Sequence, residues 1–313
     1  DSYFKNPKDV PLLLEKIGKY TEQTGPVRLM EICGTHTMAI ARSGIRSILP
    51  DNVQLLSGPG CPVCVTPANM IDMILDLSQR PGVLITTYGD LLRVPGSAQG
   101  DSLLTRRAAG GQVESVYSPM DALKIAEEHP DTEVIFLGVG FETTAPGTAA
   151  CILEAASRKL NNFSVLCLLK RTEPALRSLI ESDDFAVNGF LCPGHVAAII
   201  GADGFSFLPD DYRLPGVVSG FEPGDLLCSI LELTEMLAHG TPELKNEYTR
   251  LVRQNGNPAA LALMEQIFCP APSDWRGLGL IEDSGYAIRS QYAQWDAMKK
   301  FSLSRAGAKE IPG

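Results

Sequence analysis

The sequence lacks a hydrophobic run long enough to cross a membrane, lacks a run of basic residues, and has few aromatic side chains (7%). Apolar stretches such as residues 134–139 are far shorter than the ~20 residues that a membrane-spanning helix requires. The 27 Lys and Arg residues are outnumbered by 37 Asp and Glu residues, so the net charge is −10. This excess of acid makes nucleic acids and anionic membranes poor partners.

The chain also opens without a secretory signal peptide, so we expect a cytoplasmic protein. Asp1 is not an initiator methionine, which indicates that the N-terminus has been trimmed or processed. With 313 residues, of which 44% are hydrophobic and 20% charged, the chain is too long and too apolar to be disordered. Its length predicts about two domains.

Short apolar runs rich in β-branched residues recur along the chain, with glycine or proline at their C-terminal ends. They predict strands at 27–33, 53–57, 83–87, 113–117, 134–139, 164–169, 187–191 and 217–219. Helical patterns fill most of the gaps, at 67–77, 119–128, 147–159, 173–182 and 222–238. This alternation is typical of parallel sheets, so the predicted fold class is α/β, doubly wound.

The best break between two such units is His129-Pro130-Asp131, because proline disfavours helix at the residue before it. We therefore predict one α/β domain at 1–130 and a second at 131–222. Residues 223–313 form a helical extension that packs back on the first domain. Within this extension we expect helices at 242–253 and 258–268 and a short strand in 277–284.

Two glycine-flanked cysteine motifs end successive predicted strands: Cys33-Gly34-Thr35-His36 and Gly60-Cys61-Pro62-Val63-Cys64. In an open α/β sheet, ligands bind outside the carboxyl ends of the strands. We therefore expect Cys33, Cys61 and Cys64 to form one site with three thiols.

The residue types leave the chemistry of this site open. A Cys-x-x-Cys pair at a helix start favours thiolates and resembles redox-active dithiols. With His36, the three cysteines also make a Cys3His set, which is common in structural zinc sites. Thiolates suit iron equally well, so the ligand type alone does not name the metal.

Two further motifs follow strands in the second half, Gly140-Phe141-Glu142 and Pro193-Gly194-His195. Glu142 lies in a strand-to-helix turn, where an acid also serves as a helix cap. His195 can exchange a proton near neutral pH or simply satisfy a loop carbonyl. Because Thr143 replaces the later glycine of a dinucleotide fingerprint, the nucleotide signal is weak.

The other cysteines carry less signal. Cys151, Cys167 and Cys228 lie in apolar contexts, so we expect small core residues there. Cys269 is flanked by proline and glycine, which places it in an ordered loop and leaves its role open.

From about Asn6 to its end, the chain resembles the HypD family of nickel–iron hydrogenase maturation proteins. The resemblance rests on five stretches: EICGTHT (31–37), GPGCPVCV (58–65), GFETT (140–144), PGHV (193–196) and WRGLG (275–279). It implies two α/β domains around a cleft and a scaffold on which the Fe(CN)2CO group is assembled. The implied partners are a HypC-type small chaperone and a HypE-type cyanide carrier.

The resemblance also assigns residues. Cys33, Cys61 and Cys64 match the iron-site cysteines of the family, and His36, Glu142 and His195 match its cleft residues. Family members continue into a cysteine-rich segment that binds a 4Fe-4S cluster, whereas this sequence stops at Gly313 before such a segment. We expect that the sequence is truncated, because Cys269 alone cannot hold a cluster that needs four thiolates.

A different class of function stays open beside this one. In a cytosolic thiol-disulfide oxidoreductase, Cys61 attacks, Cys64 resolves the mixed disulfide, and Cys33 is a bystander. A third interpretation, a structural zinc protein, predicts stoichiometric zinc and loss of fold with a chelator.

Overall fold

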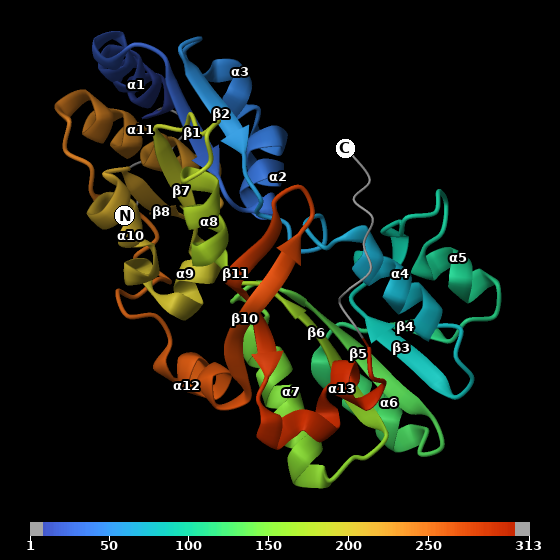
Figure 1. Cartoon of the computed structure of the whole chain (residues 1–313). Coiled ribbons are helices and arrows are strands. Elements are labelled where there is room, and N and C mark those ends of the chain that lie inside the picture. Colours follow the sequence, from blue (N-terminus) through green and yellow to red (C-terminus); the bar gives the residue numbers. More distant parts are fainter. Residues whose placement is uncertain (1–8, 304–313) are drawn as a thin grey trace. The chain divides into compact units, whose positions relative to one another are not determined.

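The computed structural model describes residues 9–303 (Figure 1). The fold is α/β with two parallel sheets, as the sequence predicts, and the chain divides into two compact units. Unit 1 contains the described residues up to Cys61 together with Ile180–Pro258. Unit 2 contains Pro62–Leu179 together with the described residues from Ala259 onward.

Unit 1 is built on a five-stranded parallel sheet with the strand order β2-β1-β7-β8-β9. Its strands are β1 (Val27–Glu31), β2 (Val53–Ser57), β7 (Gly189–Pro193), β8 (Gly216–Ser219) and β9 (Leu244–Asn246). Its helices are α1 (Val10–Thr24), α2 (Gly34–Ser43), α3 (Ile45–Ile48), α9 (Gly194–Ile200), η3 (Ala202–Phe205), α10 (Phe207–Tyr212) and α11 (Pro223–His239).

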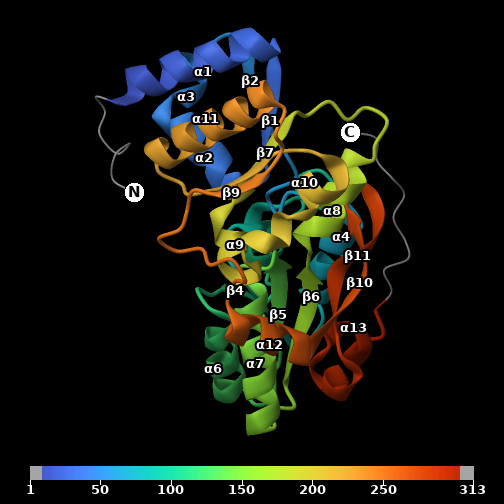
Figure 2. The same ribbon diagram turned by 90° about the vertical axis from the view of Figure 1, so that its left-hand side faces the viewer.

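Helices cover both faces of this sheet, which is what a doubly wound fold requires. On one face, Leu29, Leu191 and Val217 share a buried core with residues of α1, α2 and α11. Figures 1 and 2 both show α1 lying beside α11. On the other face, α10 packs so closely that a Cβ atom added at Gly216 would lie 2.9 Å from Leu208 Cδ1.

Unit 2 is built on a four-stranded parallel sheet with the order β4-β3-β5-β6. Its strands are β3 (Val83–Thr87), β4 (Val113–Ser115), β5 (Glu133–Gly140) and β6 (Phe163–Leu169). Unit 2 also contains a separate antiparallel hairpin of β10 (Phe268–Trp275) and β11 (Gly279–Ile288). Its helical elements are α4 (Ala68–Leu77), η2 (Leu91–Arg93), α5 (Leu103–Ala108), α6 (Pro119–Glu128), α7 (Ala145–Arg158), η4 (Ser290–Trp295) and α13 (Ala297–Lys300). The chain passes between the units at α8 (Thr172–Ile180) and α12 (Pro258–Ile267).

Two strands of the unit 2 sheet are buried from end to end, including their polar residues Thr86, Thr87 and Ser164. Every residue of β3 and β6 is buried, as expected for parallel strands covered on both faces.

Helix α6 shows how local signals in the sequence fix the start of a helix. Ser118 accepts from the Met120 amide (3.1 Å), the Asp121 carboxylate accepts from the Ser118 amide (3.0 Å), and the helix spans the predicted residues.

The two units do not follow the predicted boundaries at 130 and 222. Residues 62–130 belong to unit 2, whereas β7 pairs with β1 and β8 pairs with β7 in the unit 1 sheet. The extension at 223–313 is shared: α11 packs on α1, and the β10–β11 hairpin lies against β6. The Pro130 break is real, since α6 ends at Glu128, but it separates two elements within one unit.

Two predictions about the extension are wrong. Residues 242–253 form the short strand β9 and a loop instead of a helix, because Leu244 and Asn246 pair with β8. Cys269 lies in β10 instead of a loop. Its neighbours Pro270 and Pro272 are tolerated there because the strand is paired on one side in the hairpin.

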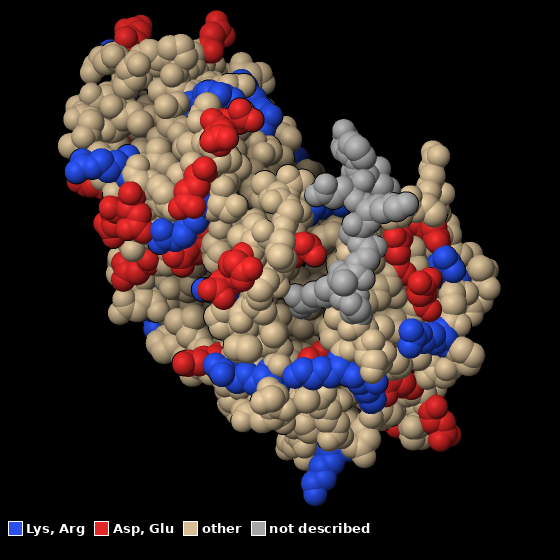
Figure 3. Space-filling model, in the orientation of Figure 1, with Lys and Arg blue, Asp and Glu red and all other residues tan. Residues whose placement is uncertain are grey.

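On the face drawn in Figure 3, both units carry side chains of either charge, and several Lys and Arg side chains form a row across the lower part of the view. Within residues 9–303, no helix is long and apolar enough to cross a membrane.

Candidate functional site

The strand order of unit 1 reverses between β1 and β7, and this is where ligands bind in open α/β sheets. Cys33 follows β1 and opens α2, while His195 follows β7 in the first turn of α9. The two strand ends are neighbours, since Glu31 pairs with Leu191 and the Ile32 amide donates to the Leu191 carbonyl. The fold therefore brings these two predicted site residues to the same edge of the sheet.

Cys33 and Cys61 come from neighbouring strand ends that touch. The Gly34 amide donates to the Gly60 carbonyl (3.0 Å), and a Cβ atom added at Gly34 would lie 3.7 Å from Cys61 Cβ. Gly60 has no room for a side chain, because its Cβ atom would lie 2.5 Å from Cys33 Cα. Glycine at this position lets the two cysteine segments approach each other.

Cys33 is the cap residue of α2 and is 9% exposed. Burial raises the pKa of its thiol, and the charge of Glu31 raises it further. The amides of Thr35 and His36 at the helix start act in the opposite direction, because they favour the thiolate. The buried thiol is thus held mainly in its protonated form until something takes the proton.

Glu31 is a buried carboxylate that sequence reasoning missed. It is 0% exposed, accepts from the Thr37 hydroxyl (2.6 Å) and accepts from the Cys33 amide (3.3 Å). Burial raises the pKa of Glu31, while the donors Ser57 and Thr37 lower it. The sequence does contain a signal for this residue, because Glu31 is an acid at the end of a strand, two positions before Cys33.

Cys61 and Cys64 are disulfide-bonded, and the other six cysteines form no disulfide. Cys64 is exposed and Cys61 is partly buried. A disulfide is not a thiolate ligand set, and among residues 9–303 no three His, Cys, Asp or Glu side chains are placed to hold a metal ion. The metal set Cys33, Cys61 and Cys64 stays a prediction that requires the reduced dithiol.

His36 and His195 both pack against Phe221. The ring centroids lie 4.6 Å apart for His36 and 3.8 Å apart for His195. His36 Nε2 lies 3.0 Å from the Gly220 carbonyl oxygen, so Nε2 carries the proton and Nδ1 keeps its lone pair. Nδ1 is buried and has no hydrogen-bond partner within the described part of the chain. Burial lowers the pKa of His36 to about 4 and also lowers the pKa of His195.

Glu142 lies in unit 2, just after β5, where the strand order of the second sheet reverses between β3 and β5. Its side chain is 4% exposed. Oε1 accepts from the Thr172 amide and Oε2 from the Thr172 hydroxyl, both at 2.7 Å. Burial raises the pKa of Glu142. The carboxylate therefore holds the first residue of α8, a capping role toward a helix distant in sequence.

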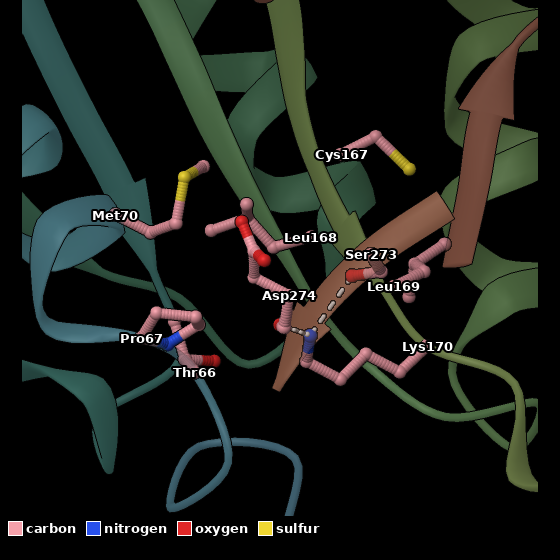
Figure 4. Close-up of a pocket in the computed structure, with 9 residues that line it drawn as sticks. All are labelled: Thr66, Pro67, Met70, Cys167, Leu168, Leu169, Lys170, Ser273 and Asp274. Carbon is pink, nitrogen blue, oxygen red and sulfur yellow. Dashed lines mark hydrogen bonds between the residues drawn. The ribbon is translucent and has the colours of Figure 1, made fainter. Parts of the chain in front are cut away.

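A small cavity lies beside the end of β6 in unit 2 and has room for about one water molecule. Lys170 lines it and is 2% exposed; its Nζ donates to Ser273 Oγ (3.0 Å) and to the Asp274 carbonyl (2.6 Å) (Figure 4). The ammonium lies 4.9 Å from the centre of the Trp275 ring. The next residue, Arg276, donates its amide to the carbonyl of Val65, directly after Cys64.

The remaining cysteines behave as packing residues. Cys151 and Cys167 are buried, as predicted, and Cys192 is fully buried in β7. Cys228 is partly buried against the unit 1 core, and burial raises the pKa of its thiol to about 12.

The comparison with protein families is decisive. A family model described as "HypD: Hydrogenase formation hypA family" matches residues 9–313. The chain belongs to the HypD family. Its HypD relatives include a hydrogenase maturation factor from Rhodobacter capsulatus, 41% identical over 312 residues, with 98% of this chain and 82% of the relative covered.

Two further HypD relatives agree with this assignment. The hydrogenase maturation factor HypD of Escherichia coli (strain K12) is 42% identical over 305 residues, with 95% of this chain and 81% of the relative covered. That of Azotobacter vinelandii is 43% identical over 311 residues, with 97% and 82% covered. The HypD match extends over both units, so the resemblance read from the motifs is confirmed.

Proposed function

We propose that this HypD-family protein is a scaffold in hydrogenase maturation, on which the Fe(CN)2CO group is assembled. The observation that carries the proposal is the contact between the Cys33 and Cys61 segments at the edge of the unit 1 sheet. Thiolates from these residues and from Cys64 would hold the iron cargo, because thiolates bind iron well. The named function of the relatives supports this use of the site.

Loading requires a change in redox state. Two electrons and two protons from an external dithiol convert the Cys61–Cys64 disulfide to two thiols, and that dithiol becomes a disulfide. The thiols then lose their protons as they bind iron. Reduction is therefore the first step, and a chain kept oxidised would not take up the cargo.

The histidines and Glu142 would manage protons during ligand delivery. His36 presents an unpartnered Nδ1 lone pair beside the cysteine motif, and His195 stands at the start of α9. Glu142 would join them only after releasing the Thr172 hydroxyl, since both its oxygens are occupied. We propose a HypC-type chaperone and a HypE-type cyanide carrier as partners, in the cytoplasm, and a 4Fe-4S cluster as a cofactor of the family.

The test uses the whole chain, reduced and kept anaerobic. Ferrous iron is added, unbound metal is removed, and bound iron is counted for wild type and for Cys33→Ser, Cys61→Ser and Cys64→Ser. Cys269→Ser, a partly buried cysteine in β10, is the matched control. We expect each of the three variants to lose most of the iron and the control to retain it. Infrared bands of bound cyanide and carbon monoxide, after incubation with the partner proteins, then report assembly.

The disulfide itself favours a second candidate, a thiol-disulfide oxidoreductase that uses Cys61 and Cys64. This function predicts catalytic reduction of a disulfide substrate that survives Cys33→Ser. If all three variants retain iron and this activity is found, the oxidoreductase function is favoured over the scaffold function. Stoichiometric zinc in the purified chain, with loss of fold in a chelator, would replace both by a structural zinc protein.

A further inference from the structure

Phe221 is held from a third side by Tyr248, a residue that the sequence placed in a helix. The two rings meet edge to face, with centroids 6.0 Å apart and planes at 85°. This geometry is favourable for aromatic pairs. Tyr248 therefore reaches the same ring that stacks on His195.

Arg250, which forms a salt bridge with Asp225, packs on the Tyr248 ring. The Arg250 guanidinium lies 4.3 Å from the centre of the Tyr248 ring. It also binds both oxygens of Asp225, with Nη1 at 2.9 Å from Oδ1 and Nη2 bonded to Oδ2. The Asp225 side chain is only 9% exposed, so this bidentate pair is partly shielded from water. Asp225 belongs to the first turn of α11, which anchors the arginine to a rigid element.

Two glycines make room for the Tyr248 ring. A Cβ atom added at Gly194 would lie 2.5 Å from Tyr248 Cδ1. A Cβ atom at Gly220 would lie 2.8 Å from Tyr248 Cδ2 and would also collide with the Asp225 carboxylate. Gly194 directly precedes His195, and Gly220 directly precedes Phe221. The absence of a side chain at these two positions therefore lets the Tyr248 ring lie close to both aromatic residues.

The loop that carries Tyr248 is itself locked to the end of α9. The Ala202 amide donates to the Arg253 carbonyl (3.1 Å), and the Asn257 amide donates to the Ile199 carbonyl (2.9 Å). Gly201 and Gly256 meet there with positive φ angles of 87° and 69°. A side chain on either glycine would collide with backbone atoms of the opposite segment. The same helix thus carries His195 at one end and the Tyr248 loop at the other.

We propose that Asp225, Arg250 and Tyr248 form a clamp that fixes Phe221 and, through it, the His195 imidazole at the carboxyl end of β7. They are positioning residues, because Tyr248 packs on Phe221 and on Gly194, the residue before His195, while Arg250 and Asp225 hold the Tyr248 ring. The functional part of this inference rests on the proposed role of His195 in maturation. A ring held within a fraction of an ångström matters, since small misplacements of a reacting group cost on the order of 100-fold in rate.

Nuclear magnetic resonance of the histidine rings tests the clamp without reference to function. Stacking at 3.8 Å places the His195 ring protons in the shielding field of Phe221. In Arg250→Met and Tyr248→Ala we expect the His195 signals to lose at least half of this shift. Tyr248→Phe keeps the ring and should keep the shift. Arg253→Met, which removes an exposed arginine of the same loop, is the matched control.

His239, another histidine of unit 1 at the end of α11, shows whether the unit stays folded. His239 packs edge to face on Tyr20 (5.6 Å), far along the helix from Asp225, and its signal should not move. Unchanged His195 signals in Arg250→Met and Tyr248→Ala would overturn the clamp.

Hydrogenase maturation in cells then tests what the clamp is for. We expect Arg250→Met and Tyr248→Ala to lose activity about tenfold or more while their iron content stays at the wild-type level. Tyr248→Phe should rescue. If these variants mature hydrogenase normally while His195→Ala does not, the positioning role is refuted. If Cys33→Ser and His195→Ala both mature hydrogenase normally, the proposed function has failed, and the ring shifts still decide the clamp separately.

Discussion

Replacing Thr172 with valine should destabilise unit 2 by leaving one oxygen of the buried Glu142 carboxylate without its donor. The Thr172 hydroxyl lies 2.7 Å from Glu142 Oε2, and Glu142 is only 4% exposed, so bulk water does not take its place. A hydrogen bond to a charged group contributes about 1.5–3 kcal/mol, and we expect a loss in that range. The Thr172 amide still donates to Oε1, which should keep α8 in place.

Tryptophan fluorescence makes this measurement specific. The chain has two tryptophans, Trp275 and Trp295, and both lie in unit 2, so fluorescence during urea unfolding follows this unit alone. Thr143→Val is the matched control, because Thr143 is exposed and directly follows Glu142. We expect the control to change the free energy of unfolding by less than about 0.5 kcal/mol.

The pH dependence gives an independent check. Burial raises the pKa of Glu142 above its ordinary value of 4.5, so the folded chain binds this proton more tightly than the unfolded chain. The stability that this group contributes is therefore present at acid pH and is lost as the pH rises through the folded pKa. Glu142→Gln removes the titration. Relative to that variant, wild type should lose about 1.4 kcal/mol for each unit by which the pKa is raised.

Two results would refute this reasoning about Glu142. One is a Thr172→Val variant no less stable than Thr143→Val. The other is a difference between wild type and Glu142→Gln that does not change with pH.

Three further outcomes follow from unit 1 and its cysteines. Gly60→Ala should destabilise unit 1 by about 1–3 kcal/mol in urea unfolding followed by circular dichroism, because its Cβ atom collides with the Cys33 backbone, whereas Gly89→Ala, with open space around it, should not. Because burial lowers the pKa of His36 from 6.5 to about 4, unit 1 should lose roughly 3 kcal/mol as the pH falls through this range. Hydrogen exchange in α2 measures this loss, which should be absent in His36→Gln. Alkylation of the denatured chain should modify six cysteines before reduction and eight after it, as counted by mass spectrometry.

The sequence by itself determined the elements that depend on local chemistry. All the predicted strands are present, because runs of β-branched residues bounded by glycine and proline have few alternatives to an extended conformation. The helix at Pro119–Glu128 was placed by its serine cap and first-turn proline, which act within four residues. The convergence of Cys33 and Cys61 at one edge also followed from sequence, since parallel strands end together.

Only the tertiary structure decided which strands share a sheet and what each buried polar group bonds to. The β7 strand pairs with β1 instead of β6, a choice made by packing of whole faces and not by any residue within the strand. Glu142 bonds to Thr172, thirty residues away, and this pairing depends on the position of α8 after β6. Tyr248 shows the same limit: its loop has helical periodicity, but its contacts with Phe221 and Arg250 are formed by segments brought together in the folded unit. Local patterns are fixed by neighbours in the chain, whereas such partners are fixed by the free energy of the assembled core.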